Sequence, residues 1–259
     1  WSTSGNWTSR VPLPQDDVYF DNAFSASQTV TADMPRLGKS IDWTGATGTP
    51  TWALNNISTT LYGGVTLISA MNVTASGSLI VYLEGRGTFS FVSSGKGFNV
   101  STVAMIGGTL NLSDAFSTSG NFVVQNGTFN TNNFSLSTVQ LSSTGTETRA
   151  INFGSSTITG TQSGAFSVFN FASTGLTLNA GTSTLLISNT GAANKSFVGG
   201  GLTYNHLKIA GGGSGPVVIP AQTHSTASTQ TVGGRSQSCF QGRLRRRYFQ
   251  GKGWGMGLM

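Results

Sequence analysis

The sequence predicts an all-β fold, a right-handed parallel β-helix (β-solenoid), on three observations. Short runs of four to eight residues alternate apolar with polar side chains, which is typical of half-buried strands. A degenerate unit, G-T-[LF]-[NS], recurs at Gly87–Ser90, Gly108–Asn111 and Gly127–Asn130, at spacings of 21 and 19 residues. Only 8% of the 259 residues are charged and 36 are Gly, which favours strands and turns over helices. Repeats of this length, each with several short strands, are typical of a solenoid.

Residues 1–56 form the first predicted element, an aromatic-rich N-terminal cap. A solenoid needs such a cap because its terminal coil would otherwise expose an apolar end and an unpaired strand edge. An irregular first pair of coils is the alternative for this segment. The segment holds four of the five tryptophans, Trp1, Trp7, Trp43 and Trp52.

Residues 57–219 form the second element, the solenoid body. Runs such as "TLYGGVTLI" (60–68) and "GLTLNAGTSTLLIS" (175–188) place Leu, Val, Ile and Phe on one side of each strand and Ser, Thr and Asn on the other. A second unit, G-L-T, recurs at Gly175 and Gly201 with a spacing of 26 residues. A β-sandwich also has short strands at regular spacing and remains the alternative.

Residues 220–259 are an atypical basic tail that we expect to lie outside the solenoid. Six of the 14 basic residues fall at 235–252, so residues 1–234 carry eight basic and eight acidic residues and are neutral. We therefore expect no nucleic-acid partner. From about residue 233 the Ser/Thr/Asn pattern stops, which suggests a shifted reading frame or a truncation junction. Cys239 is the single cysteine, and no apolar run approaches the length of a membrane span, so we expect neither a thiolate metal site nor a membrane span.

The N-terminal stretch "WSTSGNWTSRVPLPQDDVYFDNAFSASQTVT" resembles the opening segment of Ser/Thr/Gly-rich β-helix repeat proteins of tailed-phage tail fibres and bacterial surface proteins. The resemblance spans about residues 1–219 and implies a parallel β-helix with no catalytic residue to carry over. The positions that match this opening segment are Gly5, Asn6, Trp7, Val11, Pro12, Asp16, Asp17, Val18, Phe20 and Asp21.

The function that follows is a non-catalytic structural and adhesive module of a phage tail fibre or similar surface fibre. Its expected place is the virion tail or the cell surface, and its expected partners are further copies of the chain and a host surface glycan. No cofactor is expected. The alternatives are a polysaccharide-depolymerising, tailspike-like β-helix and a segment of a bacterial adhesin or autotransporter passenger.

Two groups of residues are candidates for ligand contacts. Trp43 and Trp52 flank "TGATGTP", where an exposed indole could stack on a sugar ring, although packing within the cap is the commoner fate of tryptophan. Asp16, Asp17 and Asp21 could offer oxygen ligands to Ca²⁺, although their spacing matches no calcium loop and Asp16-Asp17 is typical of a turn.

Catalysis would require two carboxylates about 5–9.5 Å apart. The body offers only Glu84, Asp114 and Glu147, each of which follows or precedes turn-forming residues. His206 and His224 stand without Cys or Asp at catalytic spacing. We therefore expect no enzymatic activity.

Overall fold

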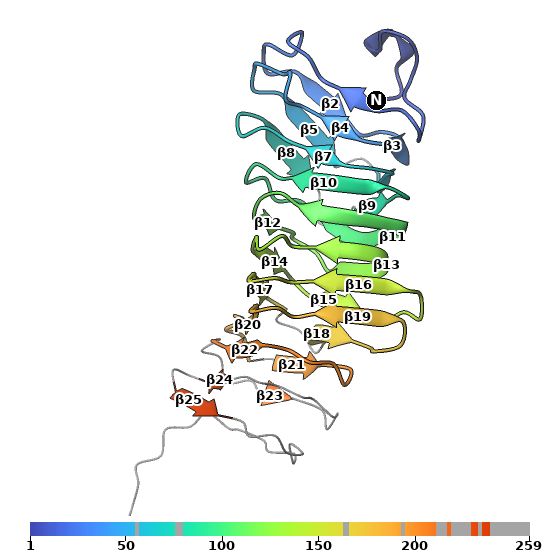
Figure 1. Cartoon of the computed structure of the whole chain (residues 1–259). Helices are drawn as coiled ribbons and strands as arrows, with labels where there is room; N and C mark the ends of the chain where they lie inside the picture. Colours follow the sequence, from blue (N-terminus) through green and yellow to red (C-terminus); the bar gives the residue numbers. More distant parts are fainter. Residues whose placement is uncertain are drawn as a thin grey trace, which may run out of the picture.

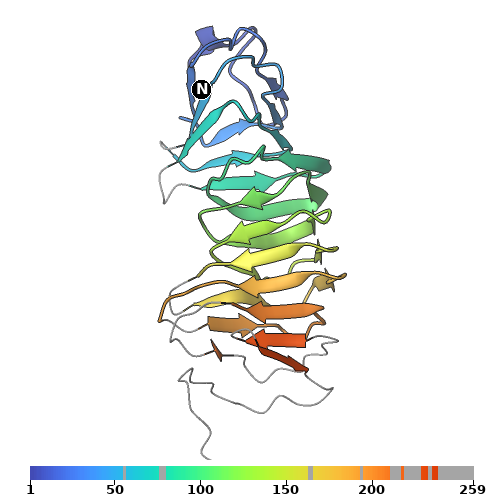
Figure 2. The same cartoon turned by 90° about the vertical axis from the view of Figure 1, so that its left-hand side faces the viewer.

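The computed structural model describes residues 1–54, 57–75, 80–162, 166–192 and 195–210, together with the strands at 217–218, 229–232 and 235–238. Strands of successive coils pair in parallel, and the coils stack along one axis to form a β-solenoid (Figures 1 and 2). Within the described residues the helical content is one 3-10 turn, η1 (Ser4–Asn6). The all-β prediction and the solenoid are confirmed, and the β-sandwich alternative is wrong, because sandwiches are built from antiparallel sheets.

Each complete coil contributes strands to three faces. Face 1 consists of β3 (Arg36–Gly38), β6 (Thr59–Leu61), β9 (Val81–Glu84), the first parts of β11 (Val100–Leu112) and β13 (Phe122–Asn130), β15 (Leu141–Ser143), β18 (Ser167–Phe171), β21 (Lys195–Val198) and β23 (Val217–Val218). Face 2 consists of β1 (Val18–Tyr19), β4 (Ile41–Asp42), β7 (Val65–Thr66), β10 (Thr88–Val92), the second parts of β11 and β13, β16 (Arg149–Asn152) and β19 (Leu176–Asn179).

Face 3 follows face 2 in the chain and is made of two sheets. The first contains β2 (Thr29–Thr31), β5 (Thr51–Leu54) and β8 (Asn72–Ala75). The second contains β12 (Phe116–Ser117), β14 (Leu136–Thr138), β17 (Thr157–Gly160), β20 (Thr184–Ile187), β22 (His206–Ile209), β24 (Thr229–Val232) and β25 (Arg235–Ser238).

Like residues stack on like residues in the core. Val18 pairs with Ile41, Ile41 with Val65, Val65 with Phe91 and Phe91 with Leu112, and all five are at most 3% exposed. Because side chains alternate across a strand, this register sends one apolar column into the interior of face 2. Burial of such columns along every face is the main source of stability for the fold.

An asparagine ladder runs along the outer side of face 2. Asn111, Asn130, Asn152 and Asn179 occupy equivalent positions in successive coils. Asn130 Nδ2 donates to Asn111 Oδ1 at 2.8 Å, and Asn152 Nδ2 donates to Asn130 Oδ1. An amide carries both a donor and an acceptor, so identical residues can satisfy one another from coil to coil.

The corner between faces 1 and 2 varies in length from coil to coil. In β11 the four residues 105–108 bulge out of register, and in β13 Gly127 alone occupies the same corner. Gly127 has φ +69°, a left-handed conformation that glycine adopts without a Cβ penalty.

Arg149 closes this corner in a later coil. The residue is 2% exposed, and its guanidinium donates to Ser143 Oγ and to the carbonyls of Ser143, Glu147, Ala172 and Thr174 at 2.6–3.1 Å. Burial lowers the Arg149 pKa, while the negative charge of Glu147 acts in the opposite direction. Every donor of the fork is satisfied, so this buried cation acts as a clamp between two coils.

An aromatic cluster lies at the N-terminal end of the stack. Phe20 stacks on Trp43 with ring centroids 3.7 Å apart, and Trp1 and Trp7 extend the cluster at 5.0 Å from one another. Ser2 anchors the first residues, because its backbone N and its Oγ donate to the Asp33 carboxylate at 2.8 and 2.7 Å. Parallel pairing already begins at β1, so the first coils and the aromatic cluster occupy the same segment, 1–56.

At the other end, backbone pairing extends past the expected boundary at residue 219. β24 pairs in parallel with β22, and β25 pairs antiparallel with β24. Among the described strands of face 3, β25 is the last and the one that runs antiparallel. Residues 239–259, which include Cys239 and most of the basic tail, lie outside the described residues, as does His224.

Candidate functional site

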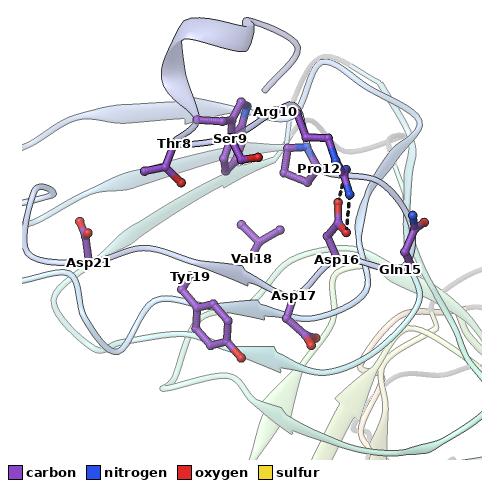
Figure 3. A pocket seen from close by; sticks show the side chains of 11 residues that line it. Thr8, Ser9, Arg10, Pro12, Gln15, Asp16, Asp17, Val18, Tyr19 and Asp21 are labelled. Atoms are coloured by element: carbon purple, nitrogen blue, oxygen red, sulfur yellow. Dashed lines mark hydrogen bonds and ion pairs between the residues drawn. The ribbon is translucent and has the colours of Figure 1, made fainter.

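A pocket of about 650 Å³ lies between the loop at residues 7–12 and the first strand of face 2, β1 (Figure 3). Thr8 and Ser9 of the loop lie on one side of it, and Asp17 and Tyr19 lie on the other. We call it the N-terminal pocket. It sits on the outside of the aromatic cluster, since Trp7 contributes to its wall and also contacts Trp1.

The alternation of β1 separates its buried side chains from its exposed ones, and both kinds line the pocket. Val18 and Phe20 are 3% and 4% exposed and point into the core. Asp17, Tyr19 and Asp21 lie at the intervening positions and therefore point outward. The Tyr19 side chain is 71% exposed, which makes it one of the two most exposed large apolar residues in the described part of the chain.

Asp16 fixes the loop that forms the pocket wall. Arg10 reaches it with both terminal nitrogens, Nη2 donating to Oδ1 at 2.9 Å and Nη1 to Oδ2, and the backbone N of Leu13 donates to Oδ2 at 2.8 Å (Figure 3). The hydrogen bond from Arg10 is the main cause that lowers the Asp16 pKa, followed by the bond from Leu13. A bidentate Arg–carboxylate pair has a fixed geometry, so the loop is held in one conformation.

The other two carboxylates are also engaged. Asp17 accepts from Lys39 Nζ at 2.7 Å, and this contact raises the Lys39 pKa. Asp21 Oδ1 accepts from the backbone N of Ala23 at 3.0 Å. Lys39 lies one coil further along the chain than Asp17, so the ion pair joins two successive coils.

These contacts contradict the calcium site suggested for Asp16, Asp17 and Asp21. A hard cation requires several oxygens converging on one point, but two of these carboxylates are already paired with cationic side chains. Within the residues that the structure describes, no group of three or more His, Cys, Asp or Glu side chains could hold a metal ion. The three aspartates instead shape and brace the pocket.

The glycan contact suggested for Trp43 and Trp52 is also wrong. Both side chains are fully buried, at 0% exposure, and their ring centroids lie 6.3 Å apart inside the aromatic cluster. A sugar ring could reach neither indole face. The flanking "TGATGTP" forms a turn, but the tryptophans on either side of it point into the core and stabilise the cap.

The three carboxylates considered for catalysis do not converge. Glu84 and Glu147 lie at the corner between faces 1 and 2, three strand steps apart, which corresponds to roughly 14 Å at the usual strand spacing. Asp114 lies at the following corner, where its carboxylate accepts from the backbone N of Ser93 at 2.8 Å and of Ser94. The separation of Glu84 and Glu147 exceeds that of the two catalytic carboxylates of glycosidases.

Sequence reasoning singled out Asp16, Asp17 and Asp21, although for a different role, but missed other residues that line or brace the N-terminal pocket, among them Arg10, Gln15, Tyr19 and Lys39. The period-two pattern of "DDVYFD" contained a signal for Tyr19, because Val18 and Phe20 as core residues place Tyr19 outside. The sequence pattern contains no such signal for Arg10 or Lys39. Their pairing with Asp16 and Asp17 depends on loop geometry and on the stacking of coils.

Comparisons of the chain with protein-family models, with curated proteins and with solved structures found no significant match. Across the described ranges, no helix is long and apolar enough to cross a membrane.

Proposed function

We propose that the chain is a non-catalytic structural and adhesive module of a surface fibre, such as a phage tail fibre, located on the virion tail or the cell surface. The observation that carries this proposal is the uninterrupted parallel pairing of face 2 from β1 to β19. Eight strands follow one another in that ladder, so seven steps extend about 34 Å along the axis.

A stack of this kind supports a mechanical role. Its backbone hydrogen bonds run along the axis, and its apolar columns continue from coil to coil, so neighbouring coils cannot slide without breaking both. The Arg149 clamp and the asparagine ladder add side-chain bonds in the same direction. Such a rod can hold a binding surface at a distance from its point of attachment.

The outer surface supports adhesion through hydrogen bonds and avidity. Residues 1–234 are neutral overall, so the surface lacks the strong field that drives nonspecific binding to polyanions. Weak contacts to a surface glycan add up when several copies of the chain form one fibre. Self-association and a glycan partner are both parts of this proposal.

The test uses the purified full chain, labelled with a fluorophore and incubated with a panel of bacterial strains. We expect retention on the surface of at least one strain, no release of reducing sugar ends, and a mass above that of one chain in light scattering. Absence of retention on every strain would refute the adhesive role. Release of reducing ends would refute the non-catalytic role, and alanine variants of Glu84, Asp114 and Glu147 would then show whether these carboxylates are responsible.

A further inference from the structure

The N-terminal pocket combines an exposed aromatic ring with a wall of polar side chains. Its volume of about 650 Å³ lies within the range of small-molecule sites, about 300–1,000 Å³. Tyr19 offers its ring at 71% exposure, whereas the neighbouring aromatic residues Phe20 and Trp43 are buried. A tyrosine so exposed contributes little to the core, and its ring is free to contact a ligand.

The charges in the pocket nearly cancel. Arg10 is paired with Asp16, and Lys39 is paired with Asp17, which leaves Asp21 as the one carboxylate of the wall without a cationic side chain paired to it among the described residues. A pocket of this balance has little attraction for a phosphate or an acidic polymer, and one remaining carboxylate is a weak site for a polycation. The field therefore favours an uncharged ligand.

The polar groups of the wall offer both donors and acceptors. Thr8 and Ser9 contribute hydroxyls, Gln15 contributes an amide, and the second carboxylate oxygen of Asp21 can accept. A ligand that matches several of them needs groups that both donate and accept. Hydroxyl groups around a ring with an apolar face meet that requirement, and the apolar face would lie on the Tyr19 ring.

We infer that the N-terminal pocket binds a neutral oligosaccharide, with Tyr19 as the stacking surface and Gln15 and Asp21 as hydrogen-bond partners. This inference rests on the proposed adhesive function, because it names the site and the ligand class through which the fibre module would attach. The Arg10–Asp16 pair holds the loop in place before the ligand arrives, which reduces the entropy lost on binding.

The test measures binding of neutral hexasaccharides of glucose, mannose and N-acetylglucosamine by saturation-transfer NMR and titration. Trigalacturonate and hexalysine serve as charged probes. The variants are Tyr19→Ala, Tyr19→Phe and Phe166→Ala, the last being a matched control, since Phe166 is also 71% exposed but lies beside β18. Tyr19 is at the surface, so far-UV circular dichroism should be unchanged in each variant.

We expect at least one neutral hexasaccharide to bind, and Tyr19→Ala to weaken it about tenfold, as truncation of an aromatic binding residue commonly does. Tyr19→Phe and Phe166→Ala should bind like the unmodified chain. The inference is overturned if no neutral probe binds, if Tyr19→Ala binds normally, or if a charged probe binds more tightly than all neutral ones. Retention of the chain on cells together with any of these results would leave the proposed function standing without this site.

Discussion

Replacing Gly127 by alanine tests whether the coils are in the close contact that the structure shows. Gly127 has φ +69°, and a Cβ built there would lie 1.7 Å from the carbonyl oxygen of Met105 in the preceding coil. Gly107 has nearly the same conformation, φ +70°, but a Cβ there meets nothing within 4 Å. The two glycines therefore differ in available space and not in backbone conformation.

The magnitudes separate the two substitutions. A left-handed conformation costs an alanine about 1–2 kcal/mol, and both variants incur this cost. At Gly127 the obstacle is a backbone oxygen, which cannot rotate away, so the coils must shift and overpacking adds about 1–3 kcal/mol or more. We expect a loss of free energy of unfolding of about 2–5 kcal/mol for Gly127→Ala and about 1–2 kcal/mol for Gly107→Ala.

Chemical denaturation followed by far-UV circular dichroism measures the free energy of unfolding of each variant, because the circular dichroism signal reports all coils and not the tryptophan-rich end alone. Gly95→Ala, at φ +76° and also without neighbours within 4 Å, is a second control. A Gly127→Ala chain that does not fold while both controls fold supports the close contact between coils. Equal destabilisation of Gly127→Ala and Gly107→Ala would refute it, since conformation alone would then explain the loss.

Three further predictions concern polar contacts. Asn130→Ala removes two hydrogen bonds of the asparagine ladder, and Asn111→Ala removes one. At about 1 kcal/mol per bond, Asn130→Ala should lower the free energy of unfolding, measured by denaturant titration, about twice as much as Asn111→Ala. Equal losses for the two variants would contradict the ladder. Arg149→Met removes five hydrogen bonds and should lower the free energy of unfolding by about 3–5 kcal/mol in the same assay. Arg149→Lys should recover only part of this loss, because lysine lacks the planar guanidinium fork. An unchanged free energy of unfolding for Arg149→Met would exclude the clamp. Because the pKa of Asp16 is lowered in the folded chain, its contact with Arg10 stabilises the fold at pH values above 3.8, the usual carboxyl pKa, and this stabilisation is lost as the pH falls through the folded-state pKa. The difference in free energy of unfolding between the unmodified chain and Asp16→Asn should therefore be present at pH 6 and shrink towards zero below pH 3.8. A difference that stays constant with pH would contradict the ion pair.

The repeat in the sequence predicted the register of the coils where their lengths are similar. Thr88 pairs with Thr109 and Thr109 with Thr128, so the three G-T-[LF]-[NS] units lie directly beside one another. Period-two alternation in these units places Leu110 and Phe129 on the core side, where they are 1% and 0% exposed, and Phe89 of the first unit is partly buried. Both successes come from local rules, namely alternation along a strand and the stacking of equivalent positions.

The same rules could not locate the N-terminal pocket. Corners between faces 1 and 2 range from the single residue Gly127 to the stretch between β15 and β16, so a fixed period does not indicate which residues of two coils meet. The contact between Asp17 and Lys39 depends on that offset. The burial of the Trp52 side chain could not be predicted for another reason. Trp52, Ala53 and Leu54 are all buried, so β5 shows no alternation that would separate an inner from an outer side of the strand.

The stacking that builds the rod also explains why its charged residues are few and where they lie. A carboxylate in the middle of a strand would face the equivalent position of the next coil at about 4.8 Å, and like charges at that distance repel. Asparagine avoids this repulsion, which is consistent with its use in the face 2 ladder. Opposite charges are tolerated where the sequence of one coil differs from the next, as for Asp17 and Lys39 in the first two coils. Five of the eight acidic residues lie in residues 1–56, where the repeat is irregular. The N-terminal end of the solenoid is therefore where this chain can place paired charges beside a cavity, and that physical restriction favours the N-terminal pocket over the repetitive body as the site of specific recognition.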